Sequence, residues 1–496
     1  MNTGKLYGVG LGPGDPELMT VKAARLISEA SVIAYHSARH GRSIARSVAE
    51  PYLREGQIEE KLVYPVTTET TDHPGGYEGA IADFYELSAK RLAEHLDAGR
   101  DVVLLCEGDP FFYGSYMYMH ERLSGRFEAI VVPGVTSVSA ASSVLGRPLV
   151  QRDEVLTVLP GTLPAPELAR RLADTDAAAV LKLGRTFSSV REAFEEAGKL
   201  DDAVFVERAT WGQQRIEPLA SVDPSSVPYF SLALLPSPAY ASRQSPASSS
   251  PSTSSGGEVV VVGLGPAGPS WLTPEAAAEL AEAEHIVGYG PYVARVPQKA
   301  GQQRHASGNR VEADRAREAL ALAAAGARVA VVSSGDPGVF AMASAVLEQA
   351  AEGHGGGVRV RVVPGVTAAQ AAASRVGAPL GHDYCVLSLS DRLKPWEIIE
   401  KRLDAAGAAD LVLALYNPAS RTRTTQLADA RSVLLRHRSA STPVVVARDV
   451  GGPEEDIRVT TLGDLDPSTV DMRCLLIVGS SRTLVENGIV WTPRSY

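Results

Sequence analysis

LYGVGLGPGDPELMT, residues 6–20, passes from a short apolar segment directly into a loop of glycine and proline. The core of this loop, Gly10-Leu11-Gly12-Pro13, returns in the second half of the chain as Gly263-Leu264-Gly265-Pro266. Three more loops return in the same order: Gly108-Asp109-Pro110 as Gly335-Asp336-Pro337, Val132-Pro133-Gly134-Val135-Thr136 as Val363-Pro364-Gly365-Val366-Thr367, and Gly146-x-Pro148-Leu149 as Gly377-x-Pro379-Leu380. The copies lie 227–253 residues apart, whereas solenoid repeats are roughly 20–50 residues long. The pattern predicts two copies of one module, both of which still bind a ligand.

Composition narrows the class of protein. With 45% hydrophobic and 21% charged residues, the 496-residue chain is typical of globular domains. Its net charge of −10 argues against a nucleic-acid partner or an anionic membrane. The three cysteines, Cys106, Cys385 and Cys474, have no metal-binding spacing, so we expect reduced thiols and no metal site. No segment resembles a signal peptide or reaches the roughly 20 apolar residues of a membrane span, which favours a cytoplasmic protein.

A Ser/Pro/Gly-rich segment at residues 237–257 separates the two halves. It has almost nothing to bury and is predicted to be a flexible linker between modules 1–236 and 258–496. In the first module, apolar runs at 6–10, 32–35, 102–106 and 129–132 alternate with helix-like segments, and a second series of runs begins near 155. This order is typical of α/β layers with buried parallel strands.

Each module is therefore predicted to consist of two α/β lobes with a cofactor cleft between them. The lobes are about 1–147 and 148–236, then about 258–378 and 379–496. Arg359 and Arg361 alternate with valine in the run 358–363, which indicates an edge or half-exposed strand.

The glycine loops also admit another interpretation. Gly263-x-Gly265-x-x-Gly268 follows a run of valines and matches a dinucleotide-binding fingerprint, which alone would indicate an NAD-dependent oxidoreductase. The corresponding loop of the first module breaks this pattern, because Gly12 is followed by Pro13, Gly14 and Asp15.

Taken together, the motifs GLGPGDPELMT, EGDPFFYGS and VVPGVTS resemble those of the tetrapyrrole methyltransferases of cobalamin (vitamin B12) biosynthesis. The first module, with YHSARHGRSIAR, is similar to precorrin-2 C(20)-methyltransferases. The second, with VGYGPYV, SSGDPGVFAMAS, LALYNPASRTR and VVVARDVG, is similar to precorrin-3B C(17)-methyltransferases. The resemblance implies the tetrapyrrole methylase fold and a bifunctional enzyme with one S-adenosyl-L-methionine per module. It implies methylation of precorrin-2 to precorrin-3A, and methylation of precorrin-3B with ring contraction to precorrin-4. Cobalt-precorrin substrates of the anaerobic route are the alternative.

The same resemblance places the methyl donor against several loops. The implied donor-binding residues of the first module are Pro13, Glu107, Gly108, Asp109, Phe112, Thr136, Ser137, Leu183 and Ala209. Those of the second module are Pro266, Ser334, Gly335, Asp336, Val339, Thr367, Ala368, Asn417 and Asp449. Asp109 and Asp336 are alternatively helix N-caps, since each precedes a proline.

A polycarboxylate tetrapyrrole calls for cationic residues, preferably arginine. His36, Arg39, His40, Arg42 and Arg46 cluster in the first module, and Arg295, Lys299, Arg304, His305 and Arg310 cluster in the second. Arg39, Arg42, Arg304 and Arg310 are the substrate-binding candidates. The residues that transfer protons are not identified by any motif; His305, His382, Asp449 and Asp391 are candidates.

Single-module members of the family are dimers, as the resemblance implies. A linker of about 20 residues spans roughly 25 Å, so it brings the two modules to roughly millimolar effective concentration. We therefore expect an intramolecular pseudo-dimer of the two modules, with a homodimer of the whole chain as the alternative.

Overall fold

The structure is a computed structural model that describes residues 3–39, 43–66, 71–151, 154–237, 257–308, 311–392 and 394–493. Most of the predicted linker therefore lies outside the described residues. The first lobe of each module is built on a five-stranded parallel sheet. In the first module the strand order is β3-β2-β4-β1-β5, and the strands are β1 (Leu6–Gly10), β2 (Val32–Ser37), β3 (Ile58–Val63), β4 (Val102–Cys106) and β5 (Ala129–Val132).

The second module repeats this sheet in the order β13-β12-β14-β11-β15. Its strands are β11 (Glu258–Gly263), β12 (His285–Tyr289), β13 (Gln303–Ser307), β14 (Arg328–Ser333) and β15 (Arg359–Val363). β15 is an edge strand, as the alternation of valine with Arg359 and Arg361 predicts. The helices that accompany the first-lobe sheets are α1 (Val21–Glu29), α2 (Ile44–Ala49), α3 (Gly76–Asp97), α4 (Tyr116–Leu123), α8 (Pro274–Glu282), α9 (Gly290–Val293), α10 (Glu312–Ala324) and α11 (Met342–Ala351).

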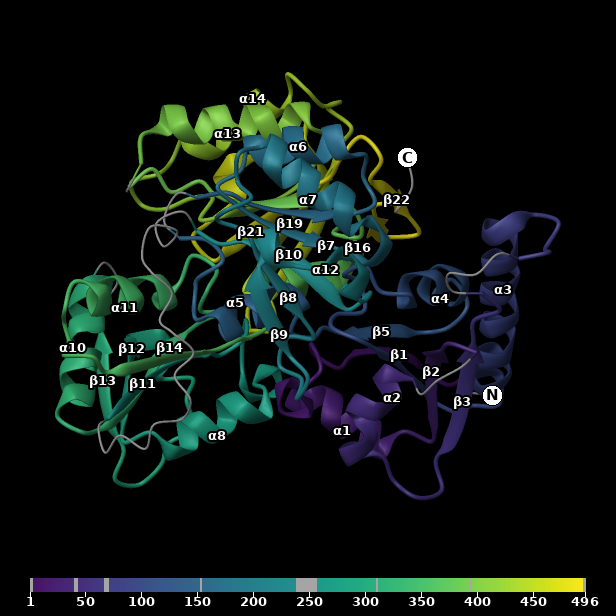
Figure 1. The fold of residues 1–496 in the computed structure, drawn as a ribbon, viewed down its shortest axis with the longest axis horizontal. Coiled ribbons are helices and arrows are strands. Elements are labelled where there is room, and N and C mark those ends of the chain that lie inside the picture. Colours follow the sequence, from purple (N-terminus) through teal and green to yellow (C-terminus); the bar gives the residue numbers. More distant parts are fainter. Residues whose placement is uncertain are drawn as a thin grey trace.

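The second lobes do not form separate sheets. They share one ten-stranded sheet in the order β20-β19-β21-β18-β17-β6-β7-β10-β8-β9. In Figure 1 this sheet lies above the two first-lobe sheets. The first module contributes β6 (Leu156–Pro160), β7 (Ala177–Leu181), β8 (Val204–Glu207), β9 (Arg215–Pro218) and β10 (Ser231–Leu235). The second contributes β17 (Tyr384–Ser388), β18 (Val412–Tyr416), β19 (Pro443–Arg448), β20 (Asp456–Thr461) and β21 (Cys474–Val478). The modules join where β6 and β17 pair antiparallel, with Val158 opposite Tyr384 and Leu156 opposite Val386.

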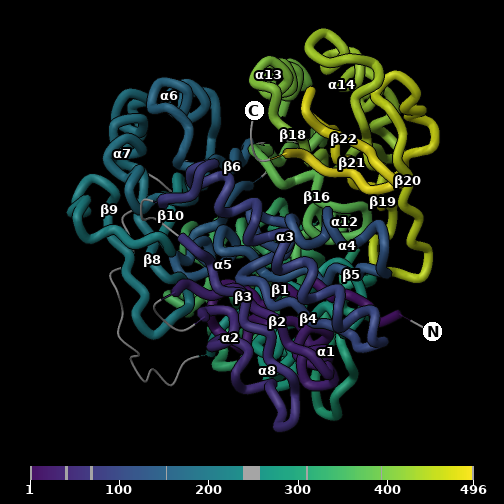
Figure 2. The backbone as a smooth tube through the Cα atoms, turned by 90° about the vertical axis from the view of Figure 1, so that its right-hand side faces the viewer, coloured from purple at the N-terminus to yellow at the C-terminus, as the bar shows by residue number. Residues whose placement is uncertain are grey.

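Successive side chains along these strands point to opposite faces of the ten-stranded sheet, and each face is covered by its own set of helices. Ala178, Val180 and Ala233 pack on one face with α6 (Ala165–Ala173) and α7 (Phe187–Glu196). The adjoining half of this face is covered by α13 (Trp396–Ala408) and α14 (Gln426–Leu434), and Figure 2 shows the two helix pairs side by side. Ala177 and Ala179 face the opposite side, which packs against α5 (Ser137–Leu145) and α12 (Ala368–Val376).

Helices α5 and α12 each also contact a first-lobe strand of the other module. α5 contacts β15 of the second module, and α12 contacts β5 of the first. A small fourth sheet of β16 (Gly377–Ala378), β22 (Leu484–Glu486) and β23 (Ile489–Trp491) completes the C-terminal region. Among the described residues, no helix has the length and apolar character needed to cross a membrane.

Candidate functional site

The first three of the four repeated loops of each module meet at the carboxyl ends of its first-lobe strands. In the first module, a pair of backbone hydrogen bonds joins Gly12 to Gly108, with N···O distances of 3.2 and 2.8 Å. Gly265 and Gly335 form the same pair in the second module, at the same two distances. In both modules, backbone hydrogen bonds between glycines therefore hold the first and second loops together.

The third loop lies so close to the second loop that no side chain fits between them. A Cβ atom at Gly134 would lie 2.1 Å from the carbonyl oxygen of Gly108, and one at Gly365 would lie 2.4 Å from that of Gly335. On its other side the second loop is open, since a Cβ at Gly108 would meet no heavy atom within 4 Å. Such a cradle of backbone with free space beside it fits a ligand held mainly by main-chain groups.

Asp109 and Asp336 tie the second and third loops together. Asp109 accepts hydrogen bonds from the amides of Phe111 (2.9 Å) and Gly134 (3.1 Å). Asp336 accepts from those of Gly338 (2.8 Å) and Gly365 (3.2 Å). Burial raises the pKa of Asp109 to about 7 and that of Asp336 to about 6. The helix N-cap interpretation is wrong for both, because no helix begins at Pro110 or Pro337; their carboxyl groups shape the loops instead.

The third loops lead into helix N-termini, as predicted. Thr136 and Thr367 are the N-caps of α5 and α12, and their hydroxyl oxygens accept from the amides of Ser139 and Gln370 at 3.3 and 3.2 Å. Ser137 and Ala368 are the first residues of these helices. The positive ends of two helix dipoles therefore face the loop clusters.

Second-lobe loops close each cluster from the other side. In the first module the indole Nε1 of Trp211 donates to the carbonyl of Pro13 (2.8 Å), and Thr210 Oγ1 accepts from the amide of Asp15 (3.2 Å). In the second module Gly451 packs against Trp271, beside the first loop that contains Pro266. The cleft between the lobes is thus bordered by loops from both.

Strained backbone marks corresponding positions around the two clefts. Nine described non-glycine residues have positive φ, and six of them form three matched pairs: Tyr113 with Phe340, Lys182 with Asn417, and Arg208 with Asp449. Such strain accumulates at functional sites. The pairing corrects the alignment predicted from sequence, because Lys182 rather than Leu183 matches Asn417, and Arg208 rather than Ala209 matches Asp449. The residues of the last two pairs each come directly after a strand: Lys182 after β7, Asn417 after β18, Arg208 after β8 and Asp449 after β19.

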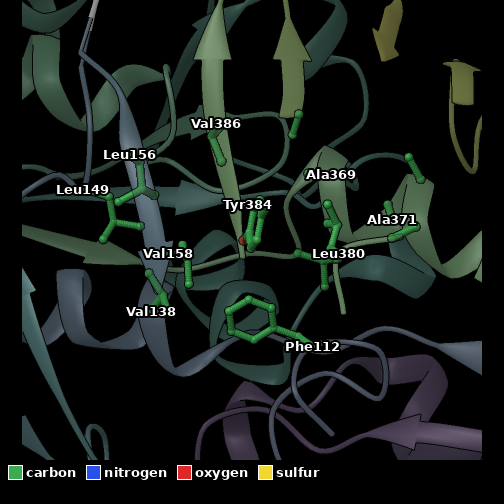
Figure 3. Close-up of a cluster of buried hydrophobic side chains, with 14 of the residues drawn as sticks. Phe112, Val138, Leu149, Leu156, Val158, Ala369, Ala371, Leu380, Tyr384 and Val386 are labelled. Carbon is green, nitrogen blue, oxygen red and sulfur yellow. The ribbon is translucent and has the colours of Figure 1, made fainter. Parts of the chain in front are cut away.

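Several predicted donor ligands direct their side chains into the core. Phe112 lies edge-on to Tyr384 of the other module, with ring centroids 6.0 Å apart, in the central cluster drawn in Figure 3. Val339 packs on the same cluster, Ala209 belongs to it, and Leu183 is buried beneath α7. The donor-binding role of these four residues remains a prediction, and it concerns mainly their backbone groups.

The two clefts differ where the second loop begins. Glu107 of the first module is exposed, and desolvation raises the pKa of its carboxyl group. Its Oε1 accepts from the amide of Ala45 (3.1 Å). Ser334 of the second module instead accepts from the guanidinium of Arg295 (3.0 Å), which also donates to the Gly265 carbonyl (2.8 Å).

The candidate substrate arginines are not brought together. Arg39 is exposed just beyond β2, and Arg42 and Arg310 lie outside the described residues. The guanidinium of Arg304 donates to the carbonyls of Val293, Val296 and Pro297. Arg304 therefore holds the end of α9, and a substrate role for it is not supported by its contacts.

Two of the proton-transfer candidates lie away from the cleft. Both ring nitrogens of His305 are occupied, by Glu318 (2.7 Å) and His285 (2.9 Å). His382 precedes β17, at the opposite sheet edge from Asn417. Asp391 and Asp449 do follow strands at the cleft edge, where Asp391 accepts from Gln426 (2.6 Å) and Asp449 from the amide of Glu454 (3.0 Å). Sequence alone could not make this distinction, because it does not show which strand edge faces the loops.

The dinucleotide-binding interpretation is wrong. A pyrophosphate site needs a helix N-terminus directly at the glycine loop, but Gly268 leads into a short 3₁₀ turn and α8 begins only at Pro274. The amide of Gly265 is already bonded to the carbonyl oxygen of Gly335.

The three cysteines, Cys106, Cys385 and Cys474, are buried free thiols. Across the described ranges, no three histidine, cysteine, aspartate or glutamate residues are grouped to hold a metal ion.

Comparison with known proteins finds relatives of the whole chain and of each of its halves. The family model of tetrapyrrole (corrin/porphyrin) methylases matches twice, at residues 5–223 and 258–466. The cobalamin biosynthesis protein CobIJ of Mycobacterium bovis is 60% identical over 99% of this chain and 96% of its own length. The precorrin-2 C(20)-methyltransferase of a Sinorhizobium species is 50% identical over 48% of this chain and 96% of its own length. The precorrin-3B C(17)-methyltransferase of a Sinorhizobium species is 47% identical, covering 48% of this chain and 97% of itself. The chain belongs to the tetrapyrrole methylase family, as two fused modules of it.

Proposed function

We propose that this chain is a bifunctional S-adenosyl-L-methionine-dependent methyltransferase of cobalamin biosynthesis. The first module methylates precorrin-2 at C(20), and the second methylates precorrin-3B at C(17) with ring contraction. The observation that carries the proposal is the duplicated loop cluster, with the same glycine contacts in both modules and different side chains beside them. The full-length similarity to CobIJ and the half-length similarity to the two single enzymes support the assignment of one reaction to each half.

Each module is proposed to hold one donor molecule, whose sulfonium supplies the methyl group. The residues that would hold it are the backbone of the second loop around Gly108 or Gly335 and the helix N-termini at Thr136 and Thr367. Because a sulfonium methyl is already reactive, the protein has mainly to orient the two partners and exclude water. Loops of glycine, proline and threonine satisfy that requirement.

The test is anaerobic incubation of the purified chain with precorrin-2 and a methyl-labelled donor. One labelled methyl group should appear at C(20), and supplied precorrin-3B should gain one at C(17) together with ring contraction. Parallel incubations with the cobalt-bearing analogues decide between the two routes, because only the true substrates should turn over at a comparable rate. Transfer to neither ring position would refute the proposal.

A further inference from the structure

The fourth repeated loop has a different place from the other three. It is Gly146-x-Pro148-Leu149 in the first module and Gly377-x-Pro379-Leu380 in the second, and it directly follows α5 or α12. Gly146 ends α5 with a left-handed backbone, at a φ of 61°, and Gly377 at the end of α12 also has positive φ. The chain therefore turns sharply out of each helix before the loop begins.

The fourth loop of the first module contacts the second loop of the second module. The amide of Val150, directly after Leu149, donates to the carbonyl of Gly338 (3.4 Å), and Val150 forms a parallel bridge with Val339. A Cβ atom at Gly338 would lie 3.7 Å from the amide nitrogen of Leu149. Gly338 and Val339 belong to the loop of residues 334–339, which is proposed above to hold the donor of the second module.

Helix α5 reinforces this contact with two serine side chains. The hydroxyl of Ser139 donates toward the carboxyl group of Asp336, a hydrogen bond that limits the rise of the Asp336 pKa. The hydroxyl of Ser143 donates to the carbonyl of Val362 on β15, the strand that leads into the third loop. A buried hydroxyl is costly unless it has a hydrogen-bond partner. The partners of Ser139 and Ser143 both belong to the second module.

These contacts border a small cavity between the two modules. Thr136 and Thr367, the N-caps of α5 and α12, both line it, together with Ser139, Leu149 and Val339. The two helix N-termini that are proposed to face the donors therefore meet at the same cavity.

The second module makes the corresponding contact with the first. Gly381, directly after Leu380, lies against α4, since a Cβ atom there would be 3.2 Å from the sulfur of Met117. Leu380 belongs to the same central cluster as Phe112, at the end of the first module's second loop, and Figure 3 shows both side chains. The fourth loop of each module therefore packs where the second loop of the other module ends.

We propose, on the basis of the donor sites proposed above, that the fourth loop and the helix before it are part of the donor site of the other module. The glycine contacts of each cradle lie within one module, whereas the other module holds the second loop in position. Ser139 and Leu149 of the first module thus act as positioning residues for the C(17) reaction. Leu380 of the second module has the same role for the C(20) reaction.

The test uses the full chain carrying Ser139→Ala, which removes one hydroxyl group and leaves the backbone of α5 intact. KM for S-adenosyl-L-methionine in the C(17) reaction should rise about 3- to 10-fold, as for one lost hydrogen bond, with little change in kcat. KM in the C(20) reaction should stay the same, although Ser139 belongs to the module that catalyses it. Ser88→Ala is the control, because Ser88 on α3 is an equally buried serine of the same module; it should change neither KM.

Calorimetry with S-adenosylhomocysteine tests the inference without either ring substrate. Ser139→Ala alone should weaken one of the two proposed sites. In Gly365→Ala the added Cβ would lie 2.4 Å from the carbonyl oxygen of Gly335 and disable the second module's site. Adding Ser139→Ala to that variant should leave the remaining site unchanged. Weakening of the remaining site, or no weakening of either site by Ser139→Ala alone, would overturn the inference. A chain that binds S-adenosylhomocysteine as expected but methylates neither ring would instead refute only the proposed function.

Leu149→Ala and Leu380→Ala change equivalent positions of the repeat, so each variant is the control for the other. Leu149→Ala should raise the donor KM of the C(17) reaction more than that of the C(20) reaction, and Leu380→Ala should do the reverse. If each variant instead impaired mainly the reaction of its own module, the fourth loop would serve its own site and the inference would be wrong.

Discussion

At the scale of single residues, the repeated glycines have a steric explanation. Gly10, Gly108 and Gly134 come from three different loops and touch through their backbones. Gly263, Gly335 and Gly365 repeat the arrangement. A methyl group at the third of these positions would overlap a carbonyl oxygen that cannot move without breaking the Gly12–Gly108 or Gly265–Gly335 pairing.

Gly134→Ala and Gly365→Ala should each disable one module only. The added Cβ would force the third loop away from the second and distort the donor cradle. Calorimetry with S-adenosylhomocysteine should then give about one site per chain in place of two. Gly134→Ala should abolish C(20) methylation and spare C(17), and Gly365→Ala should do the reverse. Gly125→Ala, whose Cβ would meet nothing within 4 Å, is the control; a loss of both sites in either loop variant would contradict independent cradles.

The buried carboxyl of Asp109 predicts a pH dependence of stability. Burial raises its pKa from an ordinary value near 4 to about 7, so folding favours the protonated form. That contribution is complete below about pH 4 and is lost as the pH rises toward 7, by roughly 1.4 kcal/mol per pKa unit of the shift. Asp109→Asn cannot ionise, so its thermal midpoint should rise relative to wild type between pH 4 and pH 7. A constant difference across that range would show that the native carboxyl titrates normally.

At the scale of elements, the β6–β17 pairing is reinforced by ion pairs between modules. Arg171 on α6 forms a buried pair with Asp383, just before β17. Arg402 on α13 reaches back to Asp176 of the first module at 2.7 Å. Helix α6 of one module is therefore attached to the start of a strand of the other.

Breaking the Arg171–Asp383 pair should destabilise the junction of the modules. Asp383→Ala removes one carboxylate partner of a buried guanidinium that also pairs with Glu167, and we expect a cost of about 3 kcal/mol. The double variant Arg171→Met with Asp383→Leu should recover most of this, because an apolar pair carries no desolvation penalty. Differential scanning calorimetry of the three proteins measures the effect. A double variant as unstable as Asp383→Ala would show that packing, not charge, is responsible.

At the scale of the whole molecule, the two modules share a sheet and a core. The central cluster contains residues of both modules on one face of the ten-stranded sheet. Separation would expose the β6 and β17 edges together with this apolar face, and such edges promote association. This arrangement favours the intramolecular pseudo-dimer over simple tethering of two independent enzymes.

Light scattering at micromolar concentration should therefore give the mass of one chain, 52.3 kDa. Residues 1–236 and 258–496 expressed separately should aggregate or self-associate, because each half exposes its unpaired edge. When co-expressed as separate chains, they should co-purify in equal amounts. A stable two-chain particle for the full-length protein, with halves that each form soluble dimers, would favour homotypic pairing of modules.

The sequence by itself determined the duplication, the α/β class, the edge position of β15 and the family. Glycine loops and strand periodicity are local signals. Gly10 and Gly134, like Gly263 and Gly365, lie in contacts that allow no Cβ atom, whereas Gly108 and Gly335 have positive φ. Only the tertiary structure decided which side chains border a cleft. Phe112 and Val339 turn into the shared core, His382 lies at the wrong sheet edge, and the left-handed residues Lys182 and Arg208 shift the matched positions by one. The shared sheet was equally beyond the sequence, because β6 and β17 lie more than 200 residues apart and their pairing depends on the fit of two complete lobes. Spacing along a chain fixes strand order only locally, whereas side-chain direction and edge pairing arise from packing over the whole molecule.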